Sequence, residues 1–474
     1  MISLTTELLP HQQAAVDKLL PVKVGALFMD MGTGKSRTAI ELAERRQGKI
    51  DKVIWFTLVS LKETVRHEIL KHTTAKVDDV YLFDDKTTAN NLPAALWYVI
   101  GLESLGSSDR VLAAVNRAVT SLTMIIVDES SYIKGHRAKR TERVISLGLQ
   151  ARYRLLLTGT PISQGIQDIF SQMYFLSPKI LGYNSWYSFS RSHLEYSDRY
   201  KGLIVRTHNE AWLAAKISPY VYQVSKEECV ELPGKGYTSH YCSLTDEQWE
   251  YYERAKEEFA TEVLENEDYG YFESSIPIFR LFSRLQAICC GFWNSNGEVS
   301  PIDNNRIPLL LDIIDQIRSD EKIVIWSKYR FAITDIINHL TNSHDRHEVC
   351  QYHGGLNEKK RHQELQRWRK SGRFLVATQA AGGHGIDLTD AATVIFYGNG
   401  FKYSERIQAE DRCNRIGQTR LVSYFDIWAN CGIEERISSA LAKKSDVVSE
   451  FKKEVDIIKS EGQYEKIKQL VESL

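Results

Sequence analysis

The sequence predicts two α/β lobes, each built on a parallel β-sheet, with a mostly helical insertion between them. Short runs of consecutive apolar residues alternate with helical stretches in the first part of the chain, and this alternation resumes near the end. Strands that are apolar throughout are typical of sheets covered by helices on both faces. The stretch between is dense in aromatic residues and then in long amphipathic runs. We expect lobe 1 at 1–180, the insertion at 181–304, and lobe 2 with a C-terminal helical brace at 305–474.

Each expected element has its own run of residues. The strands of lobe 1 are expected at 25–29, 52–58, 97–101, 123–128 and 153–159, with a helix at 36–46. The strands of lobe 2 are expected at 322–328, 374–378 and 393–398. Helices are expected in the insertion at 245–267 and 277–291, and the charged stretch 433–462 is expected to pack back on a lobe.

Composition limits the class of protein. The 474 residues include 43% hydrophobic and 26% charged side chains, a balance typical of soluble globular proteins. The net charge is -1, so any nucleic-acid binding must come from local placement of Lys and Arg. The seven cysteines are irregularly spaced without a CxxC pair, which argues against a disulfide framework and against a structural zinc site. Because we find no secretory leader and no bilayer-length apolar run, we expect a soluble, cytoplasmic or otherwise intracellular protein that has no membrane partner.

A glycine-lysine turn follows the first expected strand and opens the first expected helix. Its glycines let backbone N–H groups face a phosphate, its lysine supplies charge to the β- and γ-phosphates, and its serine offers a hydroxyl to Mg²⁺. Met29 stands where the strict P-loop pattern has glycine, so the strand–turn–helix context carries the prediction. The residues expected to bind ATP here are Gly32, Thr33, Gly34, Lys35 and Ser36.

Two acids end another expected strand of lobe 1, in IIVDESS. Asp128 suits the Mg²⁺ shell together with Ser36, and Glu129 suits a base that orients the attacking water. Two acids after a strand are also common in solvated loops. The phosphate turn on the same sheet favours the catalytic interpretation, because such sheets bind ligands at the carboxyl ends of their strands.

Lobe 2 contains a glycine-rich run and a pair of arginines. In QAEDRCNRIGQT, Arg412 and Arg415 are three residues apart and would share one side of a helix. They could form a solvated face or salt bridges, or they could meet the charge on a transferring γ-phosphoryl group. In ATQAAGGHGIDLTDA, Gly382, Gly383 and Gly385 permit close approach of another lobe or of phosphate.

Taken together, these segments resemble the motifs of superfamily 2 helicases and, within them, of the Swi/Snf-type DNA translocases. The segments that match, in the family's order, are LLPHQQAAVDKLL, MGTGKS, VIWFTLVSLKETVRHEI, YVIGLESL, the DESS segment, LLLTGTP, IVIWSKYR, QYHGGLNEKKRHQELQRW, ATQAAGGHGIDLTDA and QAEDRCNRIGQT. The last is the most diagnostic, since it departs from the family's QAEDRAHRIGQ only at Cys413 and Asn414. In DESS, Ser131 replaces the histidine that often links the ATP site to LLLTGTP.

The resemblance implies two RecA-like lobes that bind ATP between them and hydrolyse it with Mg²⁺. It implies that Gln12 contacts adenine and that Lys35, Asp128 and Glu129 act together with Gln408, Arg412 and Arg415 of lobe 2. Gly385 and Asp387 are expected to contact the nucleotide as well.

The resemblance also implies that nucleic acid lies across both lobes. The expected contacts with the sugar-phosphate backbone are Ser60, Lys62, Lys134, Arg137, Lys139 and Arg140 in lobe 1, and Ser327, Lys328, His353, Gly354, Thr378 and Gln379 in lobe 2. For the run KGHRAKR a solvated loop is the alternative. Trp186, Tyr187 and Phe189 could stack on bases, with core packing as the alternative.

The hypothesis for function is a DNA-dependent ATPase that translocates on duplex or branched DNA, with unwinding or branch migration as further candidate activities. The alternatives are an RNA or single-strand helicase, and a nucleotide-gated DNA clamp with little hydrolysis. The wording of QAEDRCNRIGQT favours DNA, and the intact acids and arginines argue against the clamp. The short insertion suits a minimal motor, and the compact length suits a bacterial or viral factor in recombination or replication. The sequence leaves the pathway, repair included, and the oligomeric state open.

Overall fold

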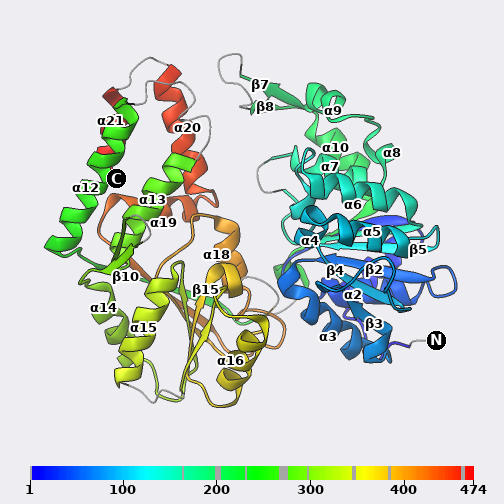
Figure 1. Cartoon of the computed structure of the whole chain (residues 1–474), viewed down its shortest axis with the longest axis horizontal. Coiled ribbons are helices and arrows are strands. Elements are labelled where there is room, and N and C mark those ends of the chain that lie inside the picture. The colour runs from blue at the N-terminus through cyan, green and yellow to red at the C-terminus, as the bar shows by residue number, and fades with distance from the viewer. Residues whose placement is uncertain are drawn as a thin grey trace. The chain divides into compact units, whose positions relative to one another are not determined.

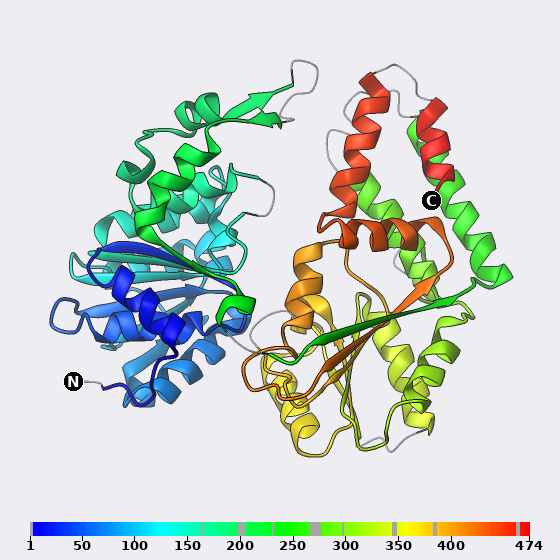
Figure 2. The same ribbon diagram turned by 180° about the vertical axis from the view of Figure 1, so that it is seen from behind.

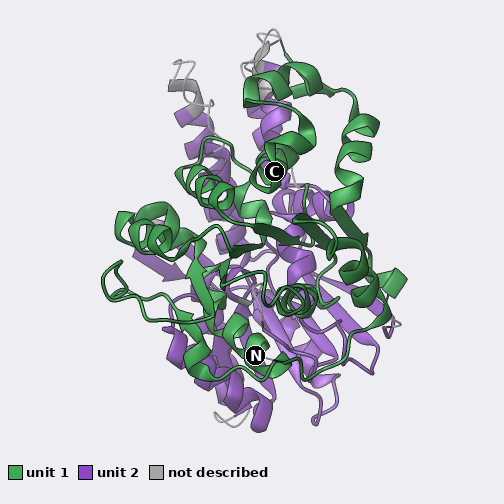
Figure 3. Ribbon diagram, turned by 90° about the vertical axis from the view of Figure 1, so that its right-hand side faces the viewer, with its two compact units in different colours: residues 1–231 green, residues 232–474 purple. Residues whose placement is uncertain are grey.

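The chain folds into two compact units, residues Met1–Glu231 and Leu232–Leu474 (Figure 3). The computed structural model describes residues 3–162, 165–197, 204–229, 232–265, 276–295, 298–343, 348–382, 386–460 and 465–474. The stretch 181–304, expected as a separate insertion, is divided: its first part belongs to unit 1 and the rest to unit 2. It is also less helical than expected, because it contributes a strand to each of the two main sheets.

Unit 1 is built on a parallel sheet whose described strands run in the order β3–β4–β2–β5–β6–β1–β9 (Figure 1). The strands are β1 (Val24–Met29), β2 (Lys52–Thr57), β3 (Val80–Leu82), β4 (Trp97–Gly101), β5 (Thr123–Asp128), β6 (Tyr153–Thr158) and β9 (Val221–Val224). All five strands expected for lobe 1 are present. The sequence analysis missed β3, which has only three residues, and β9, which lies in the stretch assigned to the insertion.

Helices cover both faces of this sheet (Figure 1). One face packs on α1 (Pro10–Leu19), α2 (Lys35–Glu44) and α3 (Lys62–His72), and the other on α4 (Leu102–Ser107), α5 (Asp109–Ala118), α6 (Lys139–Gln150) and α7 (Asp168–Leu176). Successive strand residues point to opposite faces, so Leu27 and Met29 join the first core while Ala26 and Phe28 join the second. The strands are therefore mostly apolar along their length.

The remainder of unit 1 is an aromatic-rich segment beyond the sheet. It comprises α8 (Pro178–Leu181), α9 (Trp186–His193), the antiparallel pair β7 (Leu194–Tyr196) and β8 (Ile204–Thr207), α10 (Glu210–Ile217) and α11 (Lys226–Cys229). Phe189 is fully buried and, with Trp186, packs against Phe170 of the core. Core packing thus accounts for these two aromatic residues, whereas Tyr187 is 71% exposed.

Unit 2 contains a second parallel sheet, in the order β10–β17–β16–β13–β15–β14 among its described strands. The strands are β10 (Lys235–Cys242), β13 (Ile323–Ser327), β14 (Val349–Tyr352), β15 (Phe374–Thr378), β16 (Thr393–Phe396) and β17 (Val422–Ala429). The three strands expected for lobe 2 are present, whereas β10, β14 and β17 were missed. Figure 2 shows β10 running beside β17 at the edge of the sheet, in register along its whole length.

Helices also flank both faces of the unit 2 sheet. One face packs on α14 (Arg306–Asp315) and α15 (Arg330–Ser343), and the other on α16 (Glu358–Lys370) and α18 (Tyr403–Glu410). A separate helical layer with its own apolar core contains α12 (Asp246–Glu265), α13 (Ile276–Cys289), α19 (Gly432–Ala442), α20 (Val447–Ser460) and α21 (Glu465–Glu472) (Figure 2). The C-terminal helices therefore pack on unit 2. The smaller elements are β11 (Phe292–Ser295), β12 (Glu298–Pro301) and α17 (Gln379–Gly382).

The described part of the chain has neither a membrane-length helix nor a cluster of metal-ligating side chains. None of its helices is long and apolar enough to cross a bilayer. No group of three or more His, Cys, Asp or Glu side chains within it could hold a metal ion.

The buried acid Glu44 predicts a pH dependence of stability. Burial, together with Glu41 on the same helix, raises the pKa of Glu44 from 4.5 to about 7. Between these values the unfolded chain ionises while the folded chain does not, so the free energy of unfolding falls as pH rises through this window and is lowest above it. Glu44→Gln removes this loss, and we expect the variant to gain more than about 1 kcal/mol over wild type between about pH 5 and about pH 8. Urea unfolding at both pH values measures the gain.

The exposed Glu142 on α6 provides the matched control. Glu142→Gln should change the free energy of unfolding equally at both pH values. A pH-independent difference between Glu44→Gln and wild type would contradict the assignment.

Candidate active site

The turn between β1 and α2 contains the residues expected to bind phosphate. Gly32 and Gly34 have φ values of 81° and 85°, which residues with a Cβ rarely adopt. Gly34 caps α2, which begins at Lys35. The unpaired N–H groups of a helix start favour an anion, so this turn has the backbone of a phosphate site.

The side chains of this turn differ in how far they are buried. Thr33 is fully buried and its hydroxyl donates to the Asp30 carbonyl at 2.7 Å. Lys35 donates from Nζ to the carbonyl oxygens of Met29 and Asp30, at 2.9 and 3.1 Å. Lys35 and Ser36 are each only partly buried. The ammonium and the Ser36 hydroxyl therefore lie where a bound phosphate would meet them.

The first turn of α1 lies against the phosphate turn. Gln12 donates from Nε2 to the Thr33 carbonyl at 3.1 Å and accepts at Oε1 from the Leu9 N–H at 3.0 Å. His11 Nε2 lies 2.8 Å from the same Thr33 oxygen. A Cβ added to Gly34 would come within 2.1 Å of Gln12 Nε2. Gln12 thus holds the turn, a role that the sequence analysis did not expect, and its contact with adenine stays a prediction.

The two acids lie at the carboxyl edge of the same sheet, at the end of β5. Burial, together with the Glu129 carboxylate, raises the pKa of Asp128 to about 7, while Lys35 acts in the opposite direction. Glu129 has a left-handed backbone, φ 51° and ψ 58°, in which its N–H donates to Asp128 Oδ1 at 3.0 Å. Non-glycine residues held in this conformation are concentrated at functional sites. The sheet therefore brings the lysine and both acids together.

A buried hydrogen-bonded chain connects the acid pair to LLLTGTP. Ser130, the residue after Glu129, is fully buried and donates to Gln172 Oε1 at 2.7 Å. Gln172 in turn donates from Nε2 to the Pro161 carbonyl at 2.8 Å. The sequence analysis had singled out Ser131, in the position of the family's histidine, but the structure assigns the link to Ser130. The residue that identifies Ser130 as the link is Gln172, which accepts its hydrogen bond from 42 residues further along the chain.

Three of the residues expected to contact nucleic acid in unit 1 are exposed. They are Ser60, Arg137 and Lys139. Their neighbour His136 stacks on Trp186, with ring centroids 4.0 Å apart, so the basic run is attached to the aromatic segment rather than entirely solvated. Contact with phosphate stays a prediction for all three.

The other three expected residues of unit 1 are engaged within the unit. Lys62 donates to the Phe83 carbonyl at 2.6 Å, and Lys134 lies 3.4 Å from the Asp168 carboxylate. Arg140 donates to a backbone carbonyl of the same loop at 3.2 Å. Each would have to exchange its present acceptor for phosphate.

In unit 2 most of the expected contacts are buried. Ser327 is fully buried, and Thr378 and Gln379 are 6% and 3% exposed. Gln379 accepts at Oε1 from the Gly400 N–H at 2.7 Å, so its side chain links the residue after β15 to the loop after β16. Ser327 and Thr378 end β13 and β15, and Gln379 follows directly. The buried Nε2 of Gln379 has no hydrogen-bond partner within the described part of the chain, and phosphate contact by these three residues stays a prediction.

Lys328 also differs from expectation. Its ammonium lies over the Phe401 ring and donates to Gln286 Oε1 at 3.2 Å, and burial lowers its pKa well below the usual value. By contrast, His353 is half-buried and Gly354 is exposed in the loop after β14. Among the described candidates of unit 2, only the residues of this loop are accessible enough for a contact with nucleic acid.

The arginine pair does not lie on a helix, contrary to the expected geometry. Helix α18 ends at Glu410, and the chain continues through turns in which the Arg412 carbonyl accepts from the Leu388 N–H at 3.0 Å. Gln418 donates from Nε2 to three backbone carbonyls, one of them Cys413. Arg412 is 5% exposed, and Arg415 is half-buried. Long-range hydrogen bonds, which residue spacing cannot reveal, hold residues 411–418 in a fixed series of turns, here called the pinned turn.

The remaining expected residues of the site are less informative. Gln408 is half-buried on α18. Asp387 accepts at Oδ1 from the N–H and the hydroxyl of Thr389, at 3.0 and 2.9 Å, as in a local turn. Gly385 lies outside the described residues.

A buried ionic cluster that the sequence analysis did not single out supports the arginine turn. Arg406 donates from Nε to Glu410 at 2.8 Å and from Nη2 to Asp426 at 3.0 Å. Its guanidinium also lies 3.5 Å from the Phe396 ring centroid. Since removing one member of such a cluster leaves an uncompensated buried charge, we assign Arg406 a structural role. Its place four residues before Glu410, on the same helix, was a signal in the sequence.

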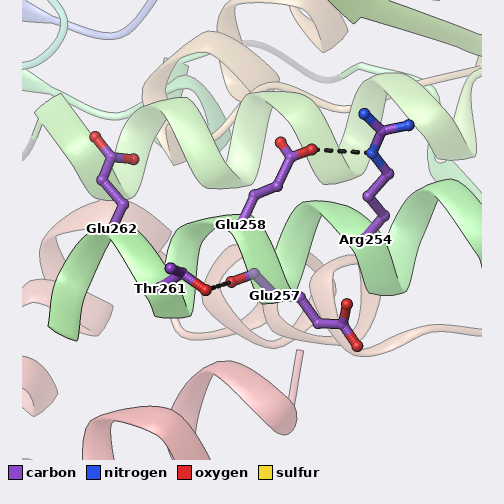
Figure 4. Close-up of a pocket in the computed structure, with 5 residues that line it drawn as sticks. All are labelled: Arg254, Glu257, Glu258, Thr261 and Glu262. Carbon is purple, nitrogen blue, oxygen red and sulfur yellow. Dashed lines mark hydrogen bonds and ion pairs between the residues drawn. The ribbon is translucent and has the colours of Figure 1, made fainter. Parts of the chain in front are cut away.

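A surface hollow on α12 is distinct from this site (Figure 4). It has a volume of about 450 Å³ and is lined by Arg254, Glu257, Glu258, Thr261 and Glu262. Arg284 and Arg280 of α13 pair with Glu258 and Glu262, at 2.7 and 3.0 Å. The hollow is rich in carboxylates, which repel a triphosphate, so it does not compete with the glycine turn as a nucleotide site.

The contact between Gly34 and Gln12 predicts a specific defect. Gly34→Ala places a Cβ on the Gln12 amide and forces alanine into the left-handed region, so we expect at least a tenfold loss of ATP affinity, measured by calorimetry. Gly48→Ala is the matched control, because Gly48 has φ +81° but its Cβ would meet nothing within 4 Å. Both variants should lose about 1–2 kcal/mol of stability to backbone strain. Equal ATP affinity in the two would show that the contact does not matter.

Two family models match this chain. Residues 11–292 match the SNF2-related domain, and residues 305–417 match the helicase conserved C-terminal domain. An uncharacterized ATP-dependent helicase of Mycoplasma pneumoniae is 27% identical over 69% of this chain and 30% of its own length. The ISWI chromatin-remodeling complex ATPase ISW2 of Saccharomyces cerevisiae is 24% identical over 89% of this chain and 38% of its own length.

The chain thus spans only about a third of the length of these curated relatives. Among solved structures, the Sulfolobus solfataricus SWI2/SNF2 ATPase core in complex with dsDNA aligns with 98% of this chain and 96% of its own, at 23% identity and a TM-score of 0.43. Because the SNF2-related match covers more than half of the residues, the chain belongs to the SNF2-related family.

Proposed function

We propose that this chain is an ATP-driven motor that hydrolyses ATP and moves along duplex DNA. The observation that carries the proposal is the arrangement in unit 1, where the capped glycine turn, Lys35 and the Asp128–Glu129 pair share one edge of the sheet. Several relatives are named for ATP-dependent helicase activity, among them ATP-dependent DNA helicase DDM1 of Arabidopsis thaliana, which is 24% identical over 66% of this chain. Their names support DNA as the track.

ATP binding would use groups that are already in place. The N–H groups at the start of α2 face the phosphates, and the Lys35 ammonium exchanges the Met29 and Asp30 carbonyls for phosphate oxygens. Ser36 and Asp128 suit a Mg²⁺ ion, because burial and Glu129 raise the pKa of Asp128 and a bound cation would favour its ionised form. Such an ion would neutralise charge on the phosphates. Gln12 keeps the turn in shape.

Hydrolysis needs a group that orients water and groups that stabilise the developing charge. We assign the first role to Glu129, whose strained backbone is fixed by its hydrogen bond to Asp128. We assign the second to Arg412 and Arg415, since guanidinium groups are the usual partners of a transferring phosphoryl group.

Coupling to movement would pass from the acid pair to LLLTGTP. Ser130 follows Glu129 directly and is joined through Gln172 to Pro161 by buried hydrogen bonds. A shift of the acids on loss of the γ-phosphate would strain this chain of bonds, because buried polar groups must keep their partners. We propose that this link replaces the family's histidine contact.

The nature of the nucleic acid decides between the alternatives. The ATPase rate should be measured without nucleic acid and then with duplex, single-stranded, forked, four-way branched and RNA ligands. Strongest stimulation by duplex or branched DNA supports the proposal, and branch migration can be followed on the same substrate. Preference for single strands or RNA would favour the helicase alternative, and a low rate with every ligand would favour the clamp.

Two substitutions test the hydrolytic site. Glu129→Gln should lower kcat by at least about hundredfold while ATP still binds, because only the water-orienting carboxylate is lost. Lys35→Ala should weaken ATP binding as well, since it removes the positive charge. ATP turnover in the presence of duplex DNA and calorimetric ATP binding measure the two effects. Wild-type turnover in both variants would exclude this site.

Arg415→Ala tests the second unit. We expect ATP binding to persist and kcat to fall by about a thousandfold, within the range for arginines that stabilise phosphoryl transfer. Arg420→Ala is the control, because Arg420 lies five residues further along and pairs with Glu321 on the surface. Full activity in Arg415→Ala, or an equal loss in the control, would remove Arg415 from the mechanism.

A further inference from the structure

Helix α16 carries an unusual concentration of positive charge. Its thirteen residues, EKKRHQELQRWRK, include six Lys or Arg and one His against two Glu. The chain as a whole is balanced, with 60 Lys+Arg and 61 Asp+Glu. Helix α16 therefore has a local excess of positive charge that the chain as a whole lacks.

The inner and outer faces of α16 differ sharply. Glu364, Leu365 and Trp368 are buried against the sheet. On the opposite face, a stripe at spacing i, i+4, i+7 and i+11 is formed by the exposed residues Lys359, Gln363, Gln366 and Lys370. The stripe contains only cationic and amide side chains, and neither Glu of the helix belongs to it.

Several cations of α16 have structural tasks, but the ends of the stripe do not. Arg367 pairs with the buried Glu364 at 2.7 Å, and Arg369 donates to the Asp387 carbonyl at 3.0 Å. Lys359 and Lys370 form no ion pair or hydrogen bond within the described part of the chain. Their ammonium groups are thus available to an outside anion.

The positive surface continues at the start of the helix. The loop of His353, Gly354 and Gly355 precedes α16, and a Cβ on Gly355 would come within 2.6 Å of the Arg330 guanidinium. Burial and the charges of Arg330 and Arg361 lower the pKa of His353. The stripe therefore extends the positive potential of the loop for which the sequence analysis expects contact with nucleic acid.

We propose that the Lys359–Gln363–Gln366–Lys370 stripe of α16 binds the phosphate backbone of nucleic acid, as an extension of the contact at His353–Gly355. The inference rests on the proposed function and extends the expected contact from the loop along the outer face of the helix that follows it. Eleven residues of helix span about 17 Å, close to the rise of five base pairs of duplex. The lysines would neutralise phosphates, and the amides between them would donate hydrogen bonds to phosphate oxygens.

The chemistry of the stripe favours nucleic acid over other anionic partners. Protein interfaces are centred on apolar and aromatic anchors, and membrane-binding helices insert an apolar face. The stripe has neither kind of residue. A linear polyanion of regular spacing is the partner that an outward row of cations and amides fits.

The test compares two double variants of equal charge. Lys359→Gln/Lys370→Gln removes both ends of the stripe, and Lys18→Gln/Lys49→Gln removes two exposed lysines of unit 1 that lie in no proposed site. The affinity for a random-sequence duplex is measured by fluorescence anisotropy over a series of salt concentrations. The melting temperature of each variant is measured alongside, and polyglutamate serves as a second, non-nucleic polyanion.

We expect the stripe variant to lose roughly tenfold to fiftyfold in duplex affinity near 0.1 M salt, and its log K against log salt slope to fall by about two. The control should keep the wild-type values. Equal affinity and slope in the two variants would overturn the inference, as would a loss of binding confined to polyglutamate. If wild type itself neither binds nor is stimulated by any nucleic acid, the proposed function fails instead. Should the melting temperature of the stripe variant fall, Gln363→Glu/Gln366→Glu provides the same test by repulsion.

Discussion

The attraction between Lys35 and Asp128 at the partly buried carboxyl edge of the unit 1 sheet is the constraint on which the proposed chemistry depends. The two residues are far apart in the chain, but both follow parallel strands, and parallel strands end on the same side of a sheet. Burial makes the Asp128 carboxylate costly to ionise, and the lysine offsets only part of that cost. The pair is therefore prepared for a ligand that brings phosphates to the lysine and a cation to the acid.

Much of the fold could be predicted from the sequence because the central strands are buried on both faces. Runs such as those of β1, β5 and β15 are apolar apart from polar residues at the ends of β5 and β15, and such a run is the signal that a covered parallel strand gives. Strand β10 gave no such signal. None of its residues is buried, since it lies at the edge of its sheet, and its sequence KGYTSHYC is largely polar. Its membership depends on pairing with β17, nearly 190 residues away, which no local pattern contains.

The parts of the candidate site that are local sequence patterns could also be predicted, and the parts that depend on long-range contacts could not. The phosphate turn and the acid pair are local patterns at strand ends, and the structure places them together. The hold of Gln12 on Thr33, the link from Ser130 to Gln172 and the shape of the arginine segment are not local. Each is a hydrogen bond between segments distant in sequence, and spacing along the chain cannot specify its partner. The helix expected for Arg412 and Arg415 was wrong for this reason.

The pinned turn that carries these arginines has a consequence for speed. Gln418 fastens it through three carbonyls, Leu388 holds Arg412 by its backbone, and Arg406 secures the preceding helix from within the core. A loop that must be ordered anew in every cycle loses conformational entropy each time. Here most of that loss is incurred once, during folding. The segment that contains the two guanidinium groups is thus preorganised. During a catalytic cycle it need not be ordered again and can move as one body.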